Sequence, residues 1–440
     1  MSNNENNEIR DSFTSKTGFI LACIGSAVGM GNIWLFPYRV GQFGGAAFLI
    51  PYIIFIVLLG YTGLMGEFAF GRMTQTGPIG SFKKALETKN KNWGGFLGII
   101  PVVGAFGIAV GYAVVVGWFL RFLGGFITGS AMSAADSGAY FGELASPFGS
   151  IIWHLLALIL VSIVLISGIS KGIETMNKIM MPAFYILFVI VMVRVFMLDG
   201  AFEGIKYLVV PKWSSLMEPK TWIYALGQAF FSLSLAGSGM IVYGSYLKRD
   251  VDIMSSAKNT VIFDTLGAFL AGLVIIPAVF AFNLDPASGP PLLFITIPSV
   301  FKLMPFGRLF GVIFFISVLF ASITSLMNLL EVPIEAVQST FKLKRKLSVF
   351  IVVGAAFIFG LFAEDGNNLG VLMDFVSIYI IPIGAFIAAV MFFWVIGIEK
   401  AKCEIECGTD KKLGKLFEIS AKYVFVFLTI FVFIAGILLG

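Results

Sequence analysis

A run of small residues interrupts the first long apolar segment of the chain at its centre. It reads GSAVGMGN from Gly25 to Asn32. Each glycine costs up to ~1 kcal/mol of helix propensity relative to alanine, and backbone freed by unwinding within a membrane needs partners other than lipid. Such a break would present backbone carbonyls and helix ends to a cation and a small charged solute at mid-membrane depth. The alternative is tight helix packing, which small residues spaced as Gly25 and Gly29 also serve.

A second run of the same kind lies in the other half of the chain. The sequence FFSLSLAGSG from Phe230 to Gly239 again places small and hydroxylated residues at the centre of an apolar segment. Two interrupted segments in corresponding positions, first and sixth, are typical of two five-helix inverted repeats with a binding site between them. The pairing therefore favours the binding interpretation over helix packing.

The composition is that of a polytopic membrane protein. Of the 440 residues, 58% are hydrophobic and 12% are charged, and the mean hydropathy is +0.95. The net charge of +5 is spread over loops, so no basic patch supports nucleic-acid binding. Cys23, Cys403 and Cys407 offer neither a disulfide framework nor zinc spacing with a nearby histidine. The single histidine, His154, is expected to be a hydrogen-bonded residue at the membrane interface without a functional role.

Apolar segments long enough for a hydrocarbon core of ~30 Å predict eleven membrane-spanning helices. No cleavable signal peptide is expected before them. Lysine and arginine gather in alternate loops, which the positive-inside rule places in the cytoplasm together with the N-terminus, so the C-terminus is expected outside. A bacterial inner (plasma) membrane fits this pattern best. The predicted helices cover residues 13–39, 43–71, 93–126, 150–168, 175–198, 221–247, 257–283, 306–340, 348–364, 369–398 and 417–439.

Five motifs in this order carry a resemblance to a known family. They are GSAVGMGNIWLFPY (25–38), GGAAFLIPY (44–52), GEFAFGR (66–72), GQAFFSLS (227–234) and ASITS (321–325). The chain resembles the neurotransmitter:sodium symporter family over nearly its whole length, and within it the eleven-helix bacterial branch that carries amino acids.

The resemblance implies an all-α membrane protein with a LeuT-type bundle. In that fold, two inverted five-helix repeats contain unwound first and sixth helices, and an eleventh helix follows. The expected divisions are a cytoplasmic N-terminal segment (1–12), the first repeat (13–198), an extracellular loop (199–220), the second repeat (221–398), a cytoplasmic loop (399–416) and the eleventh helix (417–440).

The family implies two bound sodium ions and no organic cofactor. Hard cations take oxygen ligands, and unwound backbone supplies such ligands without importing charge. For the serine and threonine ligands the alternative is a hydrogen bond back to their own helix. The resemblance points to the Ala27 carbonyl, Asn32, Ser232 and Asp264 for the first sodium, and to the carbonyls of Gly25, Val28 and Ala321 with the hydroxyls of Thr324 and Ser325 for the second.

Asp264 is a carboxylate at the centre of a predicted helix. A charge at this depth costs ~2.5 to 3.5 kcal/mol on insertion scales, so it requires a partner such as a cation. Other family members carry asparagine or serine near this position, and the chloride-dependent ones recruit an anion nearby. We therefore predict chloride-independent transport, with Asp264 supplying the negative charge.

The expected substrate is a zwitterionic amino acid. Monoamine carriers of the family place an aspartate where this chain has Gly29, so the substrate is expected to bring its own carboxylate. Tyr112 resembles the tyrosine that binds this carboxylate and Phe231 resembles the aromatic lid, with core packing as the alternative for both. Gly237 replaces a bulky phenylalanine, which predicts a pocket for a large apolar side chain such as Tyr, Phe or Trp unless Met327 refills it. The implied substrate-binding residues are Ser26, Gly29, Ile108, Tyr112, Phe231, Ser234, Ala236, Gly237, Ser325 and Leu329.

Two departures from the family concern the gates. The usual Trp-Arg-Phe-Pro has become WLFP (34–37), so Arg39, one turn further on, is expected to replace the missing arginine and bridge to Asp374 at the outer gate. At the inner gate Arg10 and Tyr246 match the family pattern. The aligned acidic partner is Ser339, which leaves Glu335 as the substitute.

Glu67 is the expected structural support of the site. The family uses this position to tie down the unwound backbone of the first and sixth helices, and backbone amides are plausible partners for a buried carboxylate. A carboxylate near the interface is the alternative, and Glu331 and Glu335 carry the same ambiguity.

The predicted function is sodium-coupled symport of an amino acid across the lipid bilayer by alternating access. A channel would need a continuous polar lining, whereas the polar residues here cluster at mid-depth. A membrane enzyme would need a nucleophile, base and orienting group, and no such arrangement occurs. A sodium-dependent amino-acid sensor and a carrier of another small amine or osmolyte remain the alternatives, and the oligomeric state stays open.

Overall fold

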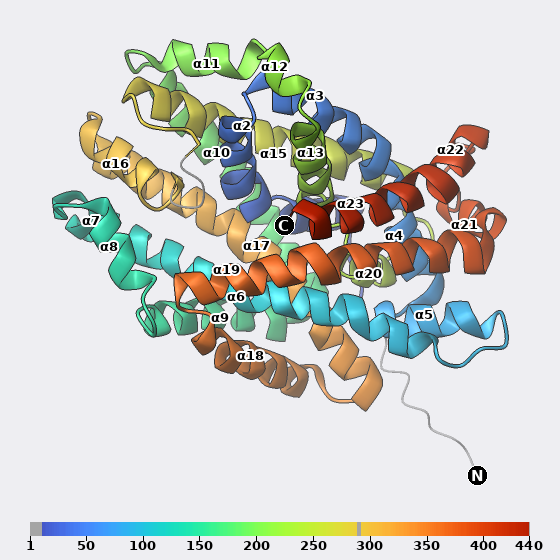
Figure 1. Ribbon diagram of the computed structural model, residues 1–440. Coiled ribbons are helices and arrows are strands. Elements are labelled where there is room, and N and C mark those ends of the chain that lie inside the picture. The colour runs from blue at the N-terminus through green and yellow to red at the C-terminus, as the bar shows by residue number, and fades with distance from the viewer. Residues whose placement is uncertain (1–10, 288–291, 440) are drawn as a thin grey trace.

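A computed structural model describes residues 11–287 and 292–439, which form helices joined by loops and short turns (Figure 1). Within these ranges, eight helical stretches are long and apolar enough to cross a membrane. They are Ala46–Thr74, Gly94–Thr128 (α6), Ile169–Phe196, Ile253–Ala281 (α15), Gly307–Phe341 (α17), Arg345–Phe362 (α18), Gly366–Ile405 and Lys415–Leu438.

Four of these stretches contain π-helical turns, which widen an α-helix locally and are labelled η. The stretch Ala46–Thr74 is divided into α3 (Ala46–Phe55), η2 (Ile56–Gly60) and α4 (Tyr61–Thr74). The stretch Ile169–Phe196 is divided into η3 (Ile169–Glu174) and α10 (Thr175–Phe196). The stretch Gly366–Ile405 comprises α19 (Gly366–Phe375), η5 (Val376–Ile380), α20 (Ile381–Ala389), η6 (Val390–Gly397) and α21 (Ile398–Ile405). The last comprises α22 (Lys415–Ile419), η7 (Ser420–Val424) and α23 (Phe425–Leu439).

The other three predicted spans are shorter or broken. The first consists of α1 (Lys16–Ala27) followed by η1 (Gly31–Leu35) and α2 (Phe36–Gln42), with a bend of 49° at the break. The fourth is the short apolar helix α9 (Ile151–Ile166). The sixth consists of α13 (Pro219–Ser232) and α14 (Gly239–Ser245), separated by six non-helical residues, 233–238.

Side chains with hydrogen-bond acceptors mark several helix starts. Ser15 caps α1 by accepting from the Gly18 amide at 3.0 Å, and Asp252 caps α15 by accepting from the Ser255 amide at 2.9 Å. Asp365 does the same for α19 through the amides of Asn367 and Asn368. These caps satisfy amides that have no partner within the helix, and they explain why the helices begin where they do.

Short helices occupy both ends of the bundle. In Figure 1, α7 (Ser130–Ser133), α8 (Ser137–Leu144) and α16 (Thr296–Leu303) lie at one end of the long helices, and α5 (Pro78–Glu87), α21 and α22 lie at the other. Two segments predicted as loops are partly helical. The 199–220 segment holds α11 (Ala201–Val209) and α12 (Trp213–Leu216), and α21 extends the tenth span into the 399–416 segment. These helices carry polar faces, so a search for long apolar runs does not detect them.

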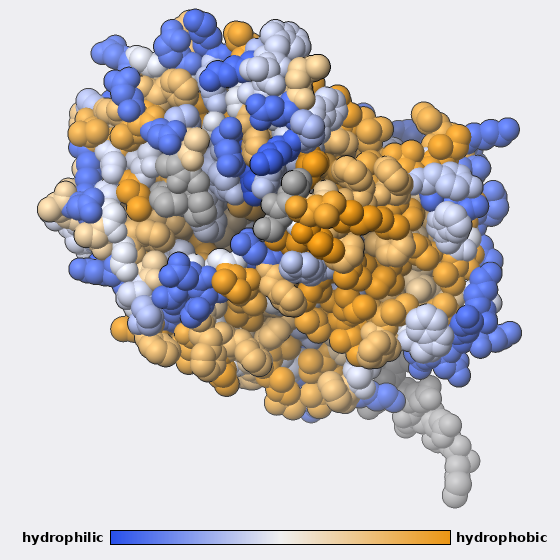
Figure 2. All heavy atoms as spheres, viewed as in Figure 1, coloured by the Kyte–Doolittle hydropathy of each residue, from blue (hydrophilic) through white to orange (hydrophobic). Residues whose placement is uncertain are grey.

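Helices α6 and α17 form the centre of the bundle and pack against each other over much of their length. Helix α10 packs against α17 from one side, and α1 contacts both α10 and α17. Figure 2 shows hydrophobic residues across the middle of one face, with hydrophilic residues gathered toward the two ends. This distribution matches a surface that faces lipid around its middle and water at its ends.

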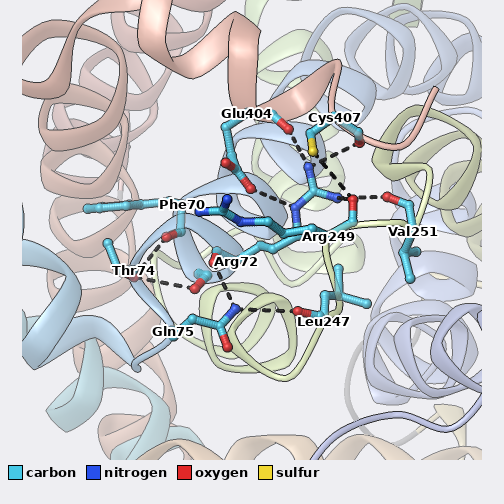
Figure 3. Close-up of polar contacts among 10 residues, drawn as sticks. Phe70, Arg72, Thr74, Gln75, Leu247, Arg249, Val251, Glu404 and Cys407 are labelled. Atoms are coloured by element: carbon cyan, nitrogen blue, oxygen red, sulfur yellow. Dashed lines mark hydrogen bonds and ion pairs between the residues drawn. The ribbon is translucent and has the colours of Figure 1, made fainter. Parts of the chain in front are cut away.

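Arg72, near the end of α4, is the most heavily bonded buried side chain at one end of the bundle (Figure 3). Its Nε donates to Glu404 Oε1 at 2.7 Å, and its Nη1 donates to the Val251 carbonyl at 2.7 Å. Its Nη2 donates to the Glu404 and Cys407 carbonyls. One guanidinium thus joins three segments: the end of α4, the turn before α15, and α21 with the turn that follows it.

Candidate functional site

The break in the first span leaves backbone groups that other elements satisfy. Helix α1 ends at Ala27, and Val28 is extended. The amides of Asn32 and Ile33 both donate to the Gly29 carbonyl at 3.1 Å, which restarts the helix. Gln228 from α13 donates to the Gly31 carbonyl at 2.7 Å. The broken backbone is therefore held by a side chain of the sixth span.

The break in the sixth span uses two residues in the left-handed region of backbone space. Ser234 has φ +53° and Gly237 has φ +68°. Glu67 from α4 accepts from the Gly237 amide at 2.9 Å, so this buried carboxylate contacts the unwound backbone. The Ser234 hydroxyl donates to the Ser26 carbonyl at 3.1 Å. The two breaks therefore face each other and are directly hydrogen bonded.

A cavity lies between the two breaks, walled by α6 on one side and α17 on the other. Nine of the ten predicted substrate-binding residues line it, all except Gly237. The lining also includes residues that the sequence did not single out, among them Asn328, Val332 and Ile381. Asn328 follows Ser325 by nearly one helical turn, and that spacing is the only signal that would have identified it.

Gly237 does not open the cavity as the sequence predicted. A Cβ atom at this position would point at α20, close to the Gly384 carbonyl and 2.9 Å from the Ala388 Cβ. The left-handed backbone turns the Cα–Cβ direction away from the cavity, which a helical alignment cannot foresee. The inference that the absent side chain enlarges the pocket is therefore wrong, and Met327 is not part of the lining.

Tyr112, Gly29 and Ser325 form the polar end of the cavity. The Tyr112 hydroxyl accepts from the Met30 amide at 2.7 Å. A Cβ at Gly29 would overlap the Tyr112 hydroxyl and lie 2.9 Å from the Ser325 Oγ. The Ser325 hydroxyl donates to the Ser26 carbonyl at 3.2 Å. Amides of the broken helix and these hydroxyls are donors suited to a carboxylate.

Three of the four residues assigned to the first sodium, Asn32, Ser232 and Asp264, are hydrogen bonded to one another. Asp264, fully buried on α15, accepts from Asn32 Nδ2 at 2.8 Å and from the Ser232 hydroxyl at 2.8 Å. The Tyr52 hydroxyl donates to Ser232 at 3.3 Å. Ala27 is the last residue of α1, and it lines the cavity. The structure thus places one buried carboxyl group beside Asn32, where the first span resumes, and Tyr52 was not anticipated.

The residues assigned to the second sodium lie where α1, α10 and α17 meet. The Thr324 hydroxyl donates to the Phe320 and Ala321 carbonyls at 3.0 and 2.9 Å, which is the back-bonded geometry named as the alternative. Gly25 approaches so closely that an added Cβ would lie 2.9 Å from the Thr324 Cβ. Val28 is completely buried. Ser325, by contrast, bonds across to α1 rather than to its own helix.

The predicted outer-gate pair is not in contact. The Arg39 guanidinium lies over the Tyr38 and Tyr224 rings, 5.0 and 4.0 Å from their centroids. Asp374 is exposed on α19. Within the described residues no salt bridge joins Arg39 to Asp374. The Arg39 guanidinium makes cation–π contacts with the two tyrosine rings instead.

Two of the inner-gate residues, Tyr246 and Glu335, contact groups that the prediction did not name. The Tyr246 hydroxyl donates to Glu331 Oε1 at 2.8 Å, and Arg345 donates to both Glu331 oxygens at 2.9 and 2.7 Å. Glu335 accepts from the Gly77 amide at 2.8 Å. Ser339 donates to the carbonyl of its own helix at Ala336. Arg10 lies outside the described residues.

His154 lies in the first turn of α9 and has a polar partner. It is fully buried within the protein, and its Nδ1 lies 3.3 Å from Glu364 Oε1. Glu364 also accepts from the Ser150 amide at 3.2 Å. The two residues are 210 positions apart, so no local pattern reveals the pair.

Comparisons with known proteins agree with this geometry. A model of the sodium:neurotransmitter symporter family matches residues 10–132 and 141–439. The uncharacterized sodium-dependent transporter YhdH of Bacillus subtilis is 37% identical over 92% of this chain and 92% of its own length. An uncharacterized sodium-dependent transporter of Methanocaldococcus jannaschii is 33% identical over 92% of this chain and 86% of its own length.

A solved structure supports the same assignment. The crystal structure of MhsT in complex with L-phenylalanine matches with a TM-score of 0.88 and 35% identity, covering 97% of this chain and 100% of that chain. The LeuT-type fold predicted from the motifs is thereby confirmed. Relatives of this group are sodium-dependent secondary transporters and not enzymes. The chain belongs to the sodium:neurotransmitter symporter family.

Proposed function

We propose that this protein takes up a zwitterionic amino acid with a large apolar or aromatic side chain, coupled to two sodium ions and independent of chloride. The substrate carboxylate would bind at the polar end of the cavity, where Tyr112 and the Gly29 backbone meet. The substrate side chain would lie toward Ile108, Phe231 and Leu329. The observation that carries this proposal is the cavity that lies between two facing helix breaks.

The apolar residues of the cavity wall, and not Gly237, support a large substrate side chain. The lining is largely apolar, with Ile108, Val332 and Ile381 among its residues. The structural relative MhsT was crystallised with L-phenylalanine. Asn328 adds one buried amide to this wall, which favours a side chain that carries a polar atom as well as apolar surface.

Alternating access around this site would move the ions and the amino acid inward together. Glu67 would hold the sixth break in place while the helices on either side of it move. We propose an inner-membrane location with the α5 and α21 end in the cytoplasm and the C-terminus outside, following the distribution of lysine and arginine.

Purified protein in liposomes with an imposed sodium gradient tests the proposal. Uptake of labelled phenylalanine should require the gradient, and competition by each of the twenty amino acids should rank Phe, Tyr and Trp above the small polar ones. A sodium current that persists without amino acid would instead indicate a channel. Sodium-dependent binding without uptake would indicate a sensor.

A further inference from the structure

Asn177, near the start of α10, is a buried amide that none of the predicted sites includes. It is fully buried. Its Nδ2 donates to the Ile173 carbonyl at 2.8 Å, one turn back on the same stretch of helix. A carbonyl can only accept, so this bond fixes which end of the amide is the oxygen. The side-chain oxygen therefore points away from its own helix.

The Asn177 oxygen faces the place assigned to the second sodium. It has no hydrogen-bond partner within residues 11–287 and 292–439. A Cβ built on Gly25 would overlap this oxygen, and the same Cβ would lie 2.9 Å from the Thr324 Cβ. Gly25 and Thr324 are both assigned to the second sodium. The oxygen is thus directed at the point where α1, α10 and α17 meet.

A buried amide oxygen without a donor is costly, and it is rarely left so without a reason. Amide oxygens are ligands for hard cations. We propose that the Asn177 side-chain oxygen completes the second sodium site from the α10 side, as an additional ligand contributed by the fifth span. This inference rests on the proposed function, because it assumes that a second sodium ion binds at the residues assigned to it.

The proposal also gives a reason for glycine at position 25. Any larger residue would occupy the space between the α1 backbone and the Asn177 oxygen. Glycine lets the amide of the fifth span approach the α1 backbone closely, so that one ion could contact both helices. The fifth span would then contact the ion directly, as α1 and α17 do.

The test measures binding of radioactive sodium to the purified full-length protein without amino acid. Asn177→Ala removes the oxygen, and Asn177→Leu removes it while keeping the volume. Either variant should weaken the apparent sodium affinity about tenfold. Asn177→Asp keeps an oxygen but loses the donor to Ile173, and it should bind sodium within about threefold of the original protein. Melting temperatures at saturating sodium should be similar for all variants that fold.

Thr324→Ala serves as the reference for the second sodium site. If it weakens sodium binding while Asn177→Ala and Asn177→Leu do not, the role of Asn177 is refuted and the proposed site stands. If Asn177→Asp is as weak as Asn177→Ala, the side chain acts only through its bond to Ile173, which also refutes the proposal. If Thr324→Ala itself leaves sodium binding unchanged, the assignment of the second site fails, and this inference fails with it.

Discussion

Asp264 is the one carboxylate assigned to the first sodium site. It is fully buried, and its two oxygens accept separately from Asn32 and Ser232. Both partners are neutral, so they orient the carboxylate without cancelling its charge. A cation beside it would supply that compensation, and a mobile anion would then be unnecessary.

We predict that replacing chloride with gluconate leaves uptake within about twofold of its original rate, because Asp264 supplies a fixed negative charge. Asp264→Asn removes that charge while keeping the shape and one acceptor. This variant should bind sodium at least tenfold more weakly, or should regain binding only when chloride is supplied. Sodium-dependent uptake of labelled phenylalanine, with and without chloride, measures both effects. Loss of uptake by the unmodified protein in gluconate would contradict the prediction.

Gly29 leaves room that a side chain would fill. A Cβ there would overlap the Tyr112 hydroxyl and crowd Ser325. Gly29→Ala should therefore weaken amino-acid binding about tenfold or more, since overpacking costs ~1 to 3 kcal/mol. Equilibrium binding of labelled phenylalanine at saturating sodium provides the measurement.

Gly227→Ala is the matched control for that substitution. It lies on α13 of the sixth span, and a Cβ there meets no atom within 4 Å. Binding by this variant should stay close to the original value. Equal losses in the two variants would mean that the space beside Tyr112 does not explain the effect.

At the scale of elements, the C-terminal half of α17 is fixed by an ion pair that involves a buried carboxylate. Glu331 is fully buried and accepts from Arg345 of α18 and from Tyr246, which follows α14. Arg345 also donates to the Leu165 carbonyl of α9 at 2.7 Å. The Glu331 carboxylate therefore joins α17 to α18 and to the residue after α14, and Arg345 extends the contact to α9.

We predict that Arg345→Met and Glu331→Met each lower the apparent melting temperature strongly, because removing one partner of a buried pair costs ~3 to 5 kcal/mol. The double variant should lose less than the sum of the two single losses, since no unpaired charge is left. Tyr246→Phe removes only one hydrogen bond, worth ~0.5 to 1.5 kcal/mol, and should be mild. Additive losses in the double variant would show that the pair is not coupled.

At the scale of the whole molecule, much of the architecture was predictable because membrane spans leave a simple signal. Long apolar runs located the eleven spans, and the small-residue runs located both breaks. The helices that escaped prediction, such as α11 and α21, are short and have polar faces. Hydropathy cannot distinguish such helices from loops.

The candidate site was predictable where a helical register or a motif fixed the direction of a side chain. Nine of the ten predicted substrate-binding residues line one cavity for that reason. Gly237 was misplaced because unwound backbone has no periodicity to direct its Cβ. The Glu331–Arg345 pair was missed because the two residues lie on different helices. Asn177 was missed because only the packing of α10 against α1 shows that its side chain faces Gly25. Arg39 was misassigned to Asp374 because sequence gives no view of the tyrosine rings that hold it.

Arg72 ties distant parts of the chain together at one end of the bundle (Figure 3). It is 1% exposed, and its partners on α21 lie more than 330 residues further along the chain. Its planar guanidinium donates to one carboxylate and several carbonyls at once, which the single ammonium of lysine cannot do. Glu404 is its only acidic partner within the described residues.

We therefore predict that Arg72→Lys does not restore what Arg72→Ala loses. Both variants should lower the apparent melting temperature by an amount equivalent to ~3 kcal/mol or more. Alanine leaves Glu404 and the buried carbonyls without their donor, and the single ammonium of lysine can reach only some of these acceptors. Both should also expose the turns at Lys248 and Lys411 to trypsin, because α21 and the turn before α15 lose their common anchor. Lys206→Ala, which removes an exposed ion pair with Glu203, is the control and should change neither measurement. An Arg72→Lys variant as stable and as protease-resistant as the original would show that charge alone suffices and that the array of carbonyl contacts contributes little.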